Sequence, residues 1–104
     1  MDVAEAIAKK ADNAAEFLSG LANTHRLLIL CELANGERNV SALINATGIA
    51  QTSMSQHLGK LKKEGIVDFR REHRTLHYFI ADEAALQIMT ILYERFCRNQ
   101  STNE

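Results

Sequence analysis

The chain has 104 residues, which is enough for one small domain but not for two independent cores. Hydrophobic residues make up 46% of it, and no apolar run approaches the roughly 18 residues of a membrane span, so we expect a packed core and no membrane insertion. The formal net charge of -1 argues, at face value, against a nucleic-acid partner, and the lack of a signal-peptide layout predicts a cytoplasmic protein with reduced thiols.

Apolar periodicity predicts five helices and one hairpin in a single domain over residues 1–100, followed by a frayed tail over 101–104. The second helix should begin after an N-cap at Asn23 or Thr24, and it is apolar nearly all round, which predicts a central buried helix. The expected helices cover residues 3–19, 24–36, 40–46, 51–64 and 82–97, and the expected strands cover 66–71 and 75–80.

Several residues mark the limits of these elements. The strands are rich in β-branched and aromatic residues and flank a tight turn near 72–74. Asp82 and Glu83 suit the positive start of the last helix. The order ααααββα, mainly α with a small β-wing, is typical of a winged helix-turn-helix. Glycines stand close to four expected element ends, at Gly20, Gly36, Gly48 and Gly65.

The expected helix over 51–64 has one apolar face and one polar face. Met54, Leu58 and Leu61 share a sector and should anchor the helix to the core. Residues 38–77 carry seven basic side chains against three acidic ones, which favours DNA binding, although a solvated charged surface is the alternative. The hydroxyl, amide and basic side chains suited to base edges and phosphates are Thr52, Ser53, Ser55, Gln56, Lys60 and Lys63 on the helix and Arg70, Arg71, His73 and Arg74 on the hairpin.

Two residues of this helix have two interpretations each. His57, at its flank, fits a hydrogen-bonding residue packed beside the 40–46 helix as well as it fits a phosphate contact. Gly59 costs about 1 kcal/mol of helix stability relative to alanine, which either a close approach of the backbone to a ligand or simple tolerance explains.

The segment AQTSMSQHLGKLKKEGIVDFRREHRTLHYFI, preceded by LANTHRLLILCELANGE, resembles the ArsR/SmtB family of bacterial winged-helix repressors. The resemblance implies a homodimer joined through the helices over 3–19 and 82–97. It implies binding to an inverted repeat in double-stranded DNA, with one 51–64 helix in each half-site. The recognition-helix positions that it implies are Gln51, Thr52, Ser53, Ser55, Gln56 and His57.

The ligand motifs of the metal sensors in this family are missing from the sequence. No thiol stands near Asn39, where one metal site has Cys-x-Cys, and Ala84 stands where a zinc site on the last helix needs histidine after Asp82. What remains is a pair of thiols, Cys31 and Cys97, each of which is most simply a buried apolar filler. Their positions resemble the two cysteines of the BigR/SqrR/HlyU branch, which respond to reactive sulfur species or oxidants.

We therefore expect a homodimeric, dithiol-controlled repressor that binds its operator when reduced and releases it when Cys31 and Cys97 are linked. No cofactor, no bound metal and no enzymatic activity are expected, since a thiol oxidoreductase needs a Cys-x-x-Cys or Cys–His arrangement. The alternatives are a metal-responsive repressor with a non-standard site that uses the cysteines and a histidine, and a constitutive DNA-binding regulator with structural cysteines. A winged helix that binds protein rather than DNA is a further alternative.

Overall fold

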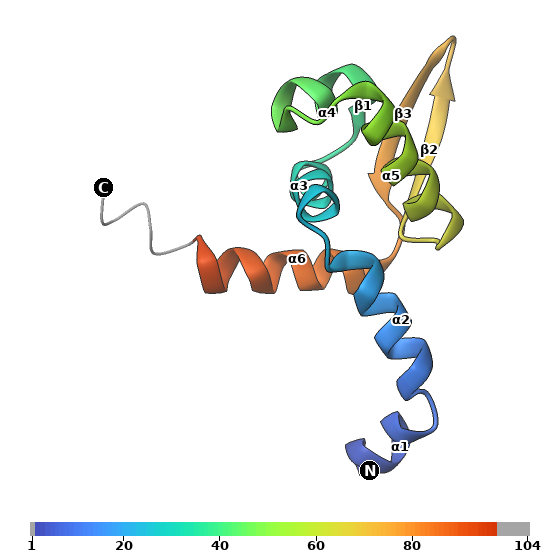
Figure 1. The fold of residues 1–104 in the computed structure, drawn as a ribbon, viewed down its shortest axis with the longest axis vertical. Helices are drawn as coiled ribbons and strands as arrows, with labels where there is room; N and C mark the ends of the chain where they lie inside the picture. The colour runs from blue at the N-terminus through green and yellow to red at the C-terminus, as the bar shows by residue number, and fades with distance from the viewer. Residues whose placement is uncertain (1, 98–104) are drawn as a thin grey trace.

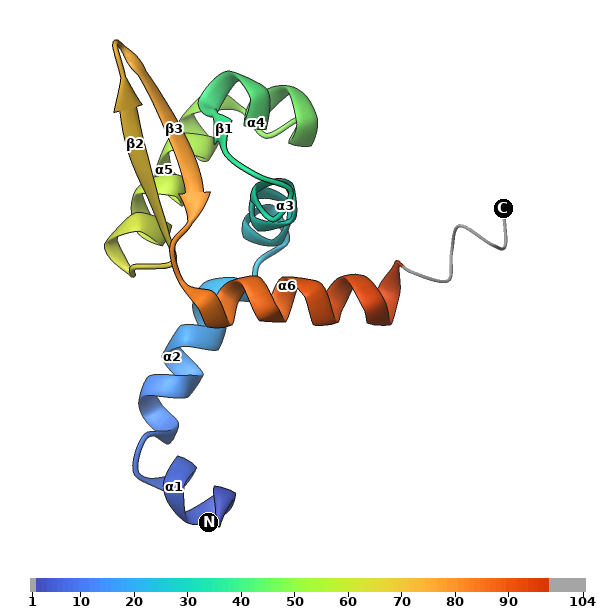
Figure 2. The ribbon, with the colours of Figure 1, turned by 180° about the vertical axis from the view of Figure 1, so that it is seen from behind.

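The computed structural model describes residues 2–97, so the frayed tail predicted over 101–104 lies outside the described residues. Figure 1 shows α3, α4, α5 and the strands gathered on one side of α6, with α2 and α1 extending away toward the N-terminus. Figure 2 shows from behind that α6 runs across the base of this group. The elements are α1 (Val3–Ala8), α2 (Ala11–Leu21), α3 (Thr24–Leu33), β1 (Arg38–Asn39), α4 (Val40–Thr47), α5 (Gln51–Lys63), β2 (Val67–Glu72), β3 (Thr75–Ile80) and α6 (Glu83–Phe96).

The core lies between α3, α4, α5 and the sheet. Ile29 and Leu30 of α3 cluster with Leu43 of α4 and with Met54 and Leu61 of α5, and all five side chains are fully buried. Burying a side chain of this size stabilises the fold by about 1.5–3 kcal/mol relative to leaving it exposed. This packing fixes α5 against α4, and the predicted winged helix-turn-helix, mainly α with a small sheet, is confirmed.

The single helix predicted over 3–19 is wrong, because the chain forms two helices there. The break falls at Lys9 and Lys10, where Lys10 has φ -123° and ψ 12° and leaves the helical conformation. Neighbouring ammonium groups repel, and Asp12 in the first turn of α2 favours a new helix start. No residue of α1 is buried, so packing within the chain does not hold a continuous helix together.

α3 begins as expected but is shorter and less enclosed. The Asn23 side chain accepts a hydrogen bond from the Arg26 N–H at 3.2 Å, which confirms the N-cap. The helix ends at Leu33 and turns before Gly36, so the predicted end is wrong. Burial all round is also wrong, since Leu28 is 42% exposed and Cys31 is exposed.

The sheet has three strands, one more than predicted. β1 is two residues long and pairs antiparallel with β3, giving the order β1-β3-β2. A pairing this short has no alternating pattern of its own in the sequence. In the hairpin, Glu72 pairs with Thr75, so only His73 and Arg74 form the loop and the predicted turn is one residue too long. His73 adopts a positive φ of 59°, as two-residue hairpin loops require.

The turn between α4 and α5 is held by Thr47. Its hydroxyl donates to the Leu43 carbonyl oxygen at 2.7 Å and accepts from the Ile49 N–H at 3.2 Å. Gly48 ends α4 with a φ of 76°, which glycine adopts at little cost. Buried Ile49 then leads directly into α5, so these bonds fix the helix-turn-helix angle.

Glycine does not end every element that the sequence suggested. Gly65, with a φ of 79°, follows the C-terminal end of α5 as expected. Gly20 lies one residue before the last residue of α2, so it too stands close to an element end, although inside the helix. Gly20 is also a point of close approach, because an added Cβ would lie 2.5 Å from Oε1 of Glu64.

α6 begins where the sequence predicted. The Asp82 side chain accepts from the Ala85 N–H at 2.9 Å, and Glu83 stands in the first turn, so the acidic start is confirmed. The helix ends at Phe96, and Cys97 is its C-cap rather than a residue within it.

Candidate nucleic-acid interface and thiol pocket

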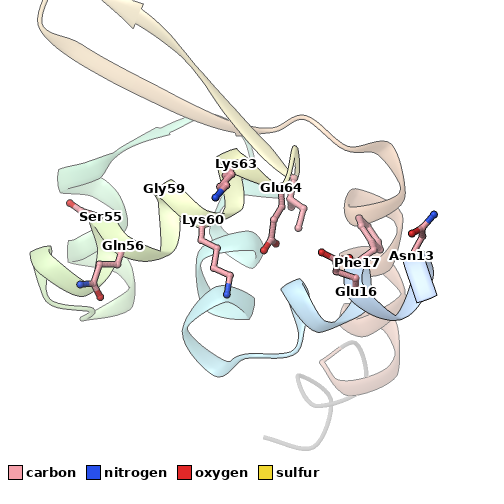
Figure 3. Close-up of a pocket in the computed structure, with 10 residues that line it drawn as sticks. Asn13, Glu16, Phe17, Ser55, Gln56, Gly59, Lys60, Lys63 and Glu64 are labelled. Carbon is pink, nitrogen blue, oxygen red and sulfur yellow. The ribbon is translucent and has the colours of Figure 1, made fainter. Parts of the chain in front are cut away.

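α5 carries the polar face predicted for DNA. Met54, Leu58 and Leu61 are buried as expected, so the opposite side of the helix is turned outward. Figure 3 shows this side along a groove of about 830 Å³, across from residues of α2 that include Glu16. Ser53 and His57 are half-buried, whereas the exposed members of the predicted set on α5 are Gln51, Thr52, Ser55, Gln56, Lys60 and Lys63.

Gly59 lies in the middle of this face. A Cβ added there would have no atom within 4 Å, so nothing in the described residues requires the absence of a side chain. Together with the exposed hydroxyl and amide groups, this leaves a shallow strip on which a groove edge can lie close to the helix backbone.

The four wing residues divide into two groups. Arg71, His73 and Arg74 are exposed at the tip of the hairpin. Arg70 is also exposed, but its Nε donates to Oε1 of Glu37 at 2.8 Å and its Nη1 lies 3.6 Å from Glu72. The bond to Glu37 raises the pKa of Arg70 above its ordinary value.

This pairing changes the charge that the wing offers to DNA. Glu37 lies just outside the basic window counted in the sequence, and it offsets a guanidinium inside it. Arg70 has to give up an ion pair before it can contact a phosphate. Because exposed ion pairs are weak, that exchange costs little.

His57 packs against the start of α3 rather than beside α4, so the predicted neighbour is wrong. Its Nδ1 accepts a hydrogen bond from Nε of Arg26 at 3.4 Å, and its ring meets the His25 ring edge-on at 5.4 Å. Burial lowers the pKa of His57, and Arg26, His25 and Lys60 lower it further. These effects therefore favour the neutral form of His57.

Cys31 and Cys97, 66 positions apart in the sequence, line one pocket of about 750 Å³. The pocket lies between α3, the end of α4 and α6 and also includes Thr47. Both thiols are exposed, so their interpretation as buried apolar filler is wrong. The apolar side chains around them are Leu27, Leu28, Met89, Leu92, Tyr93 and Phe96.

The environment of the two thiols is unequal. Cys31 is exposed, but the pocket walls partly desolvate its thiol, which raises the pKa of Cys31, and the negative charges of Cys97 and then Glu32 raise it further. The influence of Cys97 places the two sulfur atoms within electrostatic reach of each other. No histidine lines the pocket among the described residues, and residues 2–97 contain no group of three side chains that could hold a metal ion.

Sequence reasoning missed Arg26 and Glu37, which act on predicted site residues. Arg26 bonds to His57 from 31 positions away, and Glu37 bonds to Arg70 from 33 positions away. Neither partnership has a local spacing signal. The only indication in the sequence was the excess of basic residues in the wing, which favours an ion pair with an acidic residue elsewhere.

Comparison with known proteins agrees with this geometry. A family model for bacterial regulatory proteins of the arsR family matches residues 23–68. The biofilm growth-associated repressor of Agrobacterium fabrum is 40% identical, over 88% of this chain and 79% of that protein. The structure of the repressor BigR from Xylella fastidiosa has a TM-score of 0.86 at 35% identity, covering 92% of this chain and 98% of that chain. The homodimeric winged helix-turn-helix domain of Mb0332 from Mycobacterium bovis has a TM-score of 0.74 at 35% identity, covering 93% and 89%.

These matches confirm the resemblance to the family and to its BigR branch. They also confirm that the chain is not an enzyme, since its relatives are transcriptional regulators. No helix within residues 2–97 is long and apolar enough to cross a membrane. The chain therefore belongs to the arsR family of bacterial regulatory proteins, and it is a DNA-binding transcriptional regulator with a winged helix-turn-helix fold.

Proposed function

We propose that this protein is a homodimeric, cytoplasmic repressor that binds an inverted-repeat operator while Cys31 and Cys97 are free thiols. Reaction of the two cysteines with reactive sulfur species or oxidants links them and releases the DNA. The observation that carries this proposal is that two thiols distant in sequence line a single pocket.

DNA binding is assigned to α5 and the wing. In each half-site α5 lies in the major groove, where hydroxyl and amide groups meet base edges and lysines meet phosphates. The exposed arginines at the hairpin tip reach the backbone or the adjacent minor groove. The residues assigned to this face are Gln51, Thr52, Ser53, Ser55, Gln56, Lys60, Lys63, Arg70, Arg71, His73 and Arg74, with His57 at its inner flank.

The dimer is assigned to the outer helices. Ile7 of α1, Leu18 of α2 and Ile91 of α6 are exposed apolar side chains, as are Tyr93 and Phe96. An apolar surface of this extent supports coverage by a partner. A second copy is the favoured occupant because the homodimeric Mb0332 domain has a similar fold. The copy also supplies the second reading helix for a half-site about 34–36 Å away.

The trigger reaction is an ordinary thiol exchange. The raised pKa of Cys31 lowers its thiolate fraction, so we assign the first attack to Cys97. Its thiolate attacks the terminal sulfur of a persulfide RSSH, and the thiolate RS⁻ leaves. Cys31 then attacks the inner sulfur of the resulting Cys97 persulfide, which forms a disulfide and expels HS⁻.

Two variants of this reaction also join Cys31 to Cys97, one through a trisulfide and one through a disulfide. When both cysteines have become persulfides, their combination expels one H₂S and leaves a trisulfide. A peroxide instead converts Cys97 to a sulfenic acid, and attack by Cys31 releases water. Extra sulfur atoms relax the limit of about 7 Å between Cα atoms that a direct disulfide imposes.

The link acts on DNA binding through the elements that share the pocket. It ties α3 to α6. α3 belongs to the half of the subunit from α3 to β3 that carries the proposed DNA-binding face, here called the reading half, and α6 belongs to the proposed dimer surface. A rotation of one reading half against the other moves the two α5 helices out of register with their half-sites. Small rotations suffice because the half-site spacing is fixed by the DNA helix.

The test combines mass spectrometry with operator binding. The reduced protein is treated with an inorganic polysulfide salt, both cysteines are mapped, and operator affinity is measured before and after. We expect a linked pair and a large loss of affinity, both absent in Cys31→Ser and Cys97→Ser. Unlinked cysteines with unchanged affinity would refute the switch. Loss of affinity on zinc addition in the wild type, absent in the double serine variant, would favour a metal sensor that uses these cysteines instead.

Non-reducing electrophoresis locates the link. A monomer band places it within one subunit, as expected from the shared pocket of one chain. A covalent dimer band means that the bond joins two subunits and that the pocket does not bring the reacting thiols together.

A further inference from the structure

Arg26 joins three helices on the inner side of the proposed reading face. It stands in the first turn of α3, where its own N–H is bonded to the Asn23 cap. Its Nη1 donates to the carbonyl oxygen of Gly20 in α2 at 3.2 Å, and its Nε donates to Nδ1 of His57 in α5 at 3.4 Å. The side chain is half-buried, so the guanidinium is committed to these partners rather than extended into solvent.

The end of α2 therefore meets α5 at two separate places. One is the bridge through Arg26 to His57, in the middle of α5. The other is direct, where Gly20 lies against the carboxylate of Glu64, the C-cap of α5. In Figure 3, α2 and the C-terminal half of α5 face each other across the groove, with Glu16 and Phe17 opposite Glu64. Two separate contacts fix the angle between α2 and α5, whereas a single contact would let α5 rotate about it.

We propose that Arg26 is a positioning residue for DNA binding, because its bridge from Gly20 to His57 sets the angle of α5 against α2 and holds only while His57 is neutral. This inference rests on the proposed reading face of α5 and is independent of the thiol switch. α2 belongs to the proposed dimer surface, so the angle determines how the two α5 helices are presented to an inverted repeat.

The need for a neutral histidine follows from the donor arrangement. Arg26 has only donors, so Nδ1 of His57 must be an acceptor and the ring proton is on Nε2. A proton on Nδ1 removes the acceptor and sets an imidazolium against a guanidinium. His25 of α3 and Lys60 of α5 also face this ring, and both add repulsion when charged. The lowered pKa of His57 agrees with a site built for the neutral ring.

This role predicts an effect of pH opposite in sign to that of a phosphate contact. A histidine that contacts phosphate binds DNA more tightly when it is protonated, since it gains a positive charge. A histidine in the Arg26 bridge lowers operator affinity when protonated, because α5 is released from α2. The sign of the His57 contribution therefore separates the two roles that the sequence left open.

The experiment measures operator affinity from about pH 5 to about pH 8 for the reduced dimer. Arg26→Lys keeps the charge but a lysine ammonium cannot reproduce the planar fork, so we expect affinity about tenfold weaker at neutral pH. Arg38→Lys, the same change in β1 outside the residues assigned to DNA and to the dimer, should leave affinity unchanged. His57→Asn offers Arg26 an amide oxygen without titrating, so its affinity should fall less on acidification than that of the wild type.

Three outcomes decide the proposal. It is overturned if Arg26→Lys binds the operator as tightly as the wild type. It is also overturned if the operator affinity of His57→Asn falls more steeply on acidification than that of the wild type. If Arg26→Lys proves unstable in a thermal melt, the His57→Asn pH profile alone gives the same decision. Gln56→Ala and Lys63→Ala check the reading face, because unchanged affinity in both would refute that face rather than the bridge.

Discussion

The region from α3 to β3 and the outer helices α1, α2 and α6 differ in where their apolar side chains lie. In the first region Leu30, Leu43 and Met54 are fully buried within one chain. In the outer helices Leu18 and Ile91 are exposed, Ile91 by 63%. The core is completed by Leu21 of α2 and by Ala85 and Met89 of α6, but the outer helices also carry apolar side chains that a single chain leaves uncovered. The same α3 carries both environments on its two sides.

The largest effect is expected from the buried side of α3. Leu30→Ala should lower the free energy of unfolding by about 3 kcal/mol, because it removes a fully buried side chain and leaves a cavity. Leu28→Ala, on the exposed side of the same helix, is the matched control and should cost much less at low protein concentration. Urea unfolding followed by circular dichroism measures both. Equal losses would mean that the two sides of α3 do not differ.

The next effect concerns the uncovered surface of α6. Ile91→Glu places a charge in the proposed dimer interface, so sedimentation equilibrium should show a monomer. Operator affinity should fall by at least about tenfold, because the two reading heads no longer bind as one unit. Ser41→Glu adds the same charge at an exposed position of α4, outside the proposed dimer surface, and should remain dimeric. A dimer in both variants would contradict the assignment of this surface.

A smaller effect is expected at Gly59, on the open face of α5. Gly59→Ala should raise the free energy of unfolding by up to about 1 kcal/mol, because helix propensity improves and no atom lies within 4 Å of the new methyl group. Operator affinity should fall, because the methyl group stands where DNA approaches the helix. Thermal melts and binding isotherms on one preparation test this. Improved stability with unchanged affinity would place the DNA elsewhere on the helix.

The smallest effect is a shift in thiol reactivity where the two regions meet. Cys97→Ser removes the second largest cause of the raised pKa of Cys31, so this pKa should move down toward its ordinary value but stay above it because burial remains. Alkylation of Cys31 at fixed neutral pH should become faster, since more thiolate is present. Glu32→Gln removes the third cause and should produce a smaller change in the same direction. An unchanged alkylation rate in Cys97→Ser would show that the two thiols do not interact.

The sequence was sufficient to predict features that depend on residues close together in the chain, such as the buried side of a helix and its N-cap. The spacing of Met54, Leu58 and Leu61 predicted which side of α5 is buried. Asn23 and Asp82 marked helix starts because their side chains bond to N–H groups three residues on. The family resemblance added the two cysteines as a pair, which spacing alone does not reveal.

What the sequence did not predict depends on contacts between distant segments. β1 exists because β3 offers it a pairing edge, and the break before α2 reflects the lack of core contacts for α1. The partners of His57 and Arg70 come from other elements, so a helical wheel left His57 with two interpretations and a charge count gave Arg70 no partner. Long-range pairing of this kind leaves no periodic signal in the sequence.

Thr47 belongs both to the pocket of the two cysteines and to the turn between α4 and α5. Thr47 lines the pocket that contains Cys31 and Cys97, and its hydroxyl hydrogen-bonds to Leu43 and Ile49 in the turn that orients α5. The pocket around the two cysteines and the turn before α5 thus share a residue. In the proposed switch, a group bound in this pocket would touch the turn directly, without intermediate side chains.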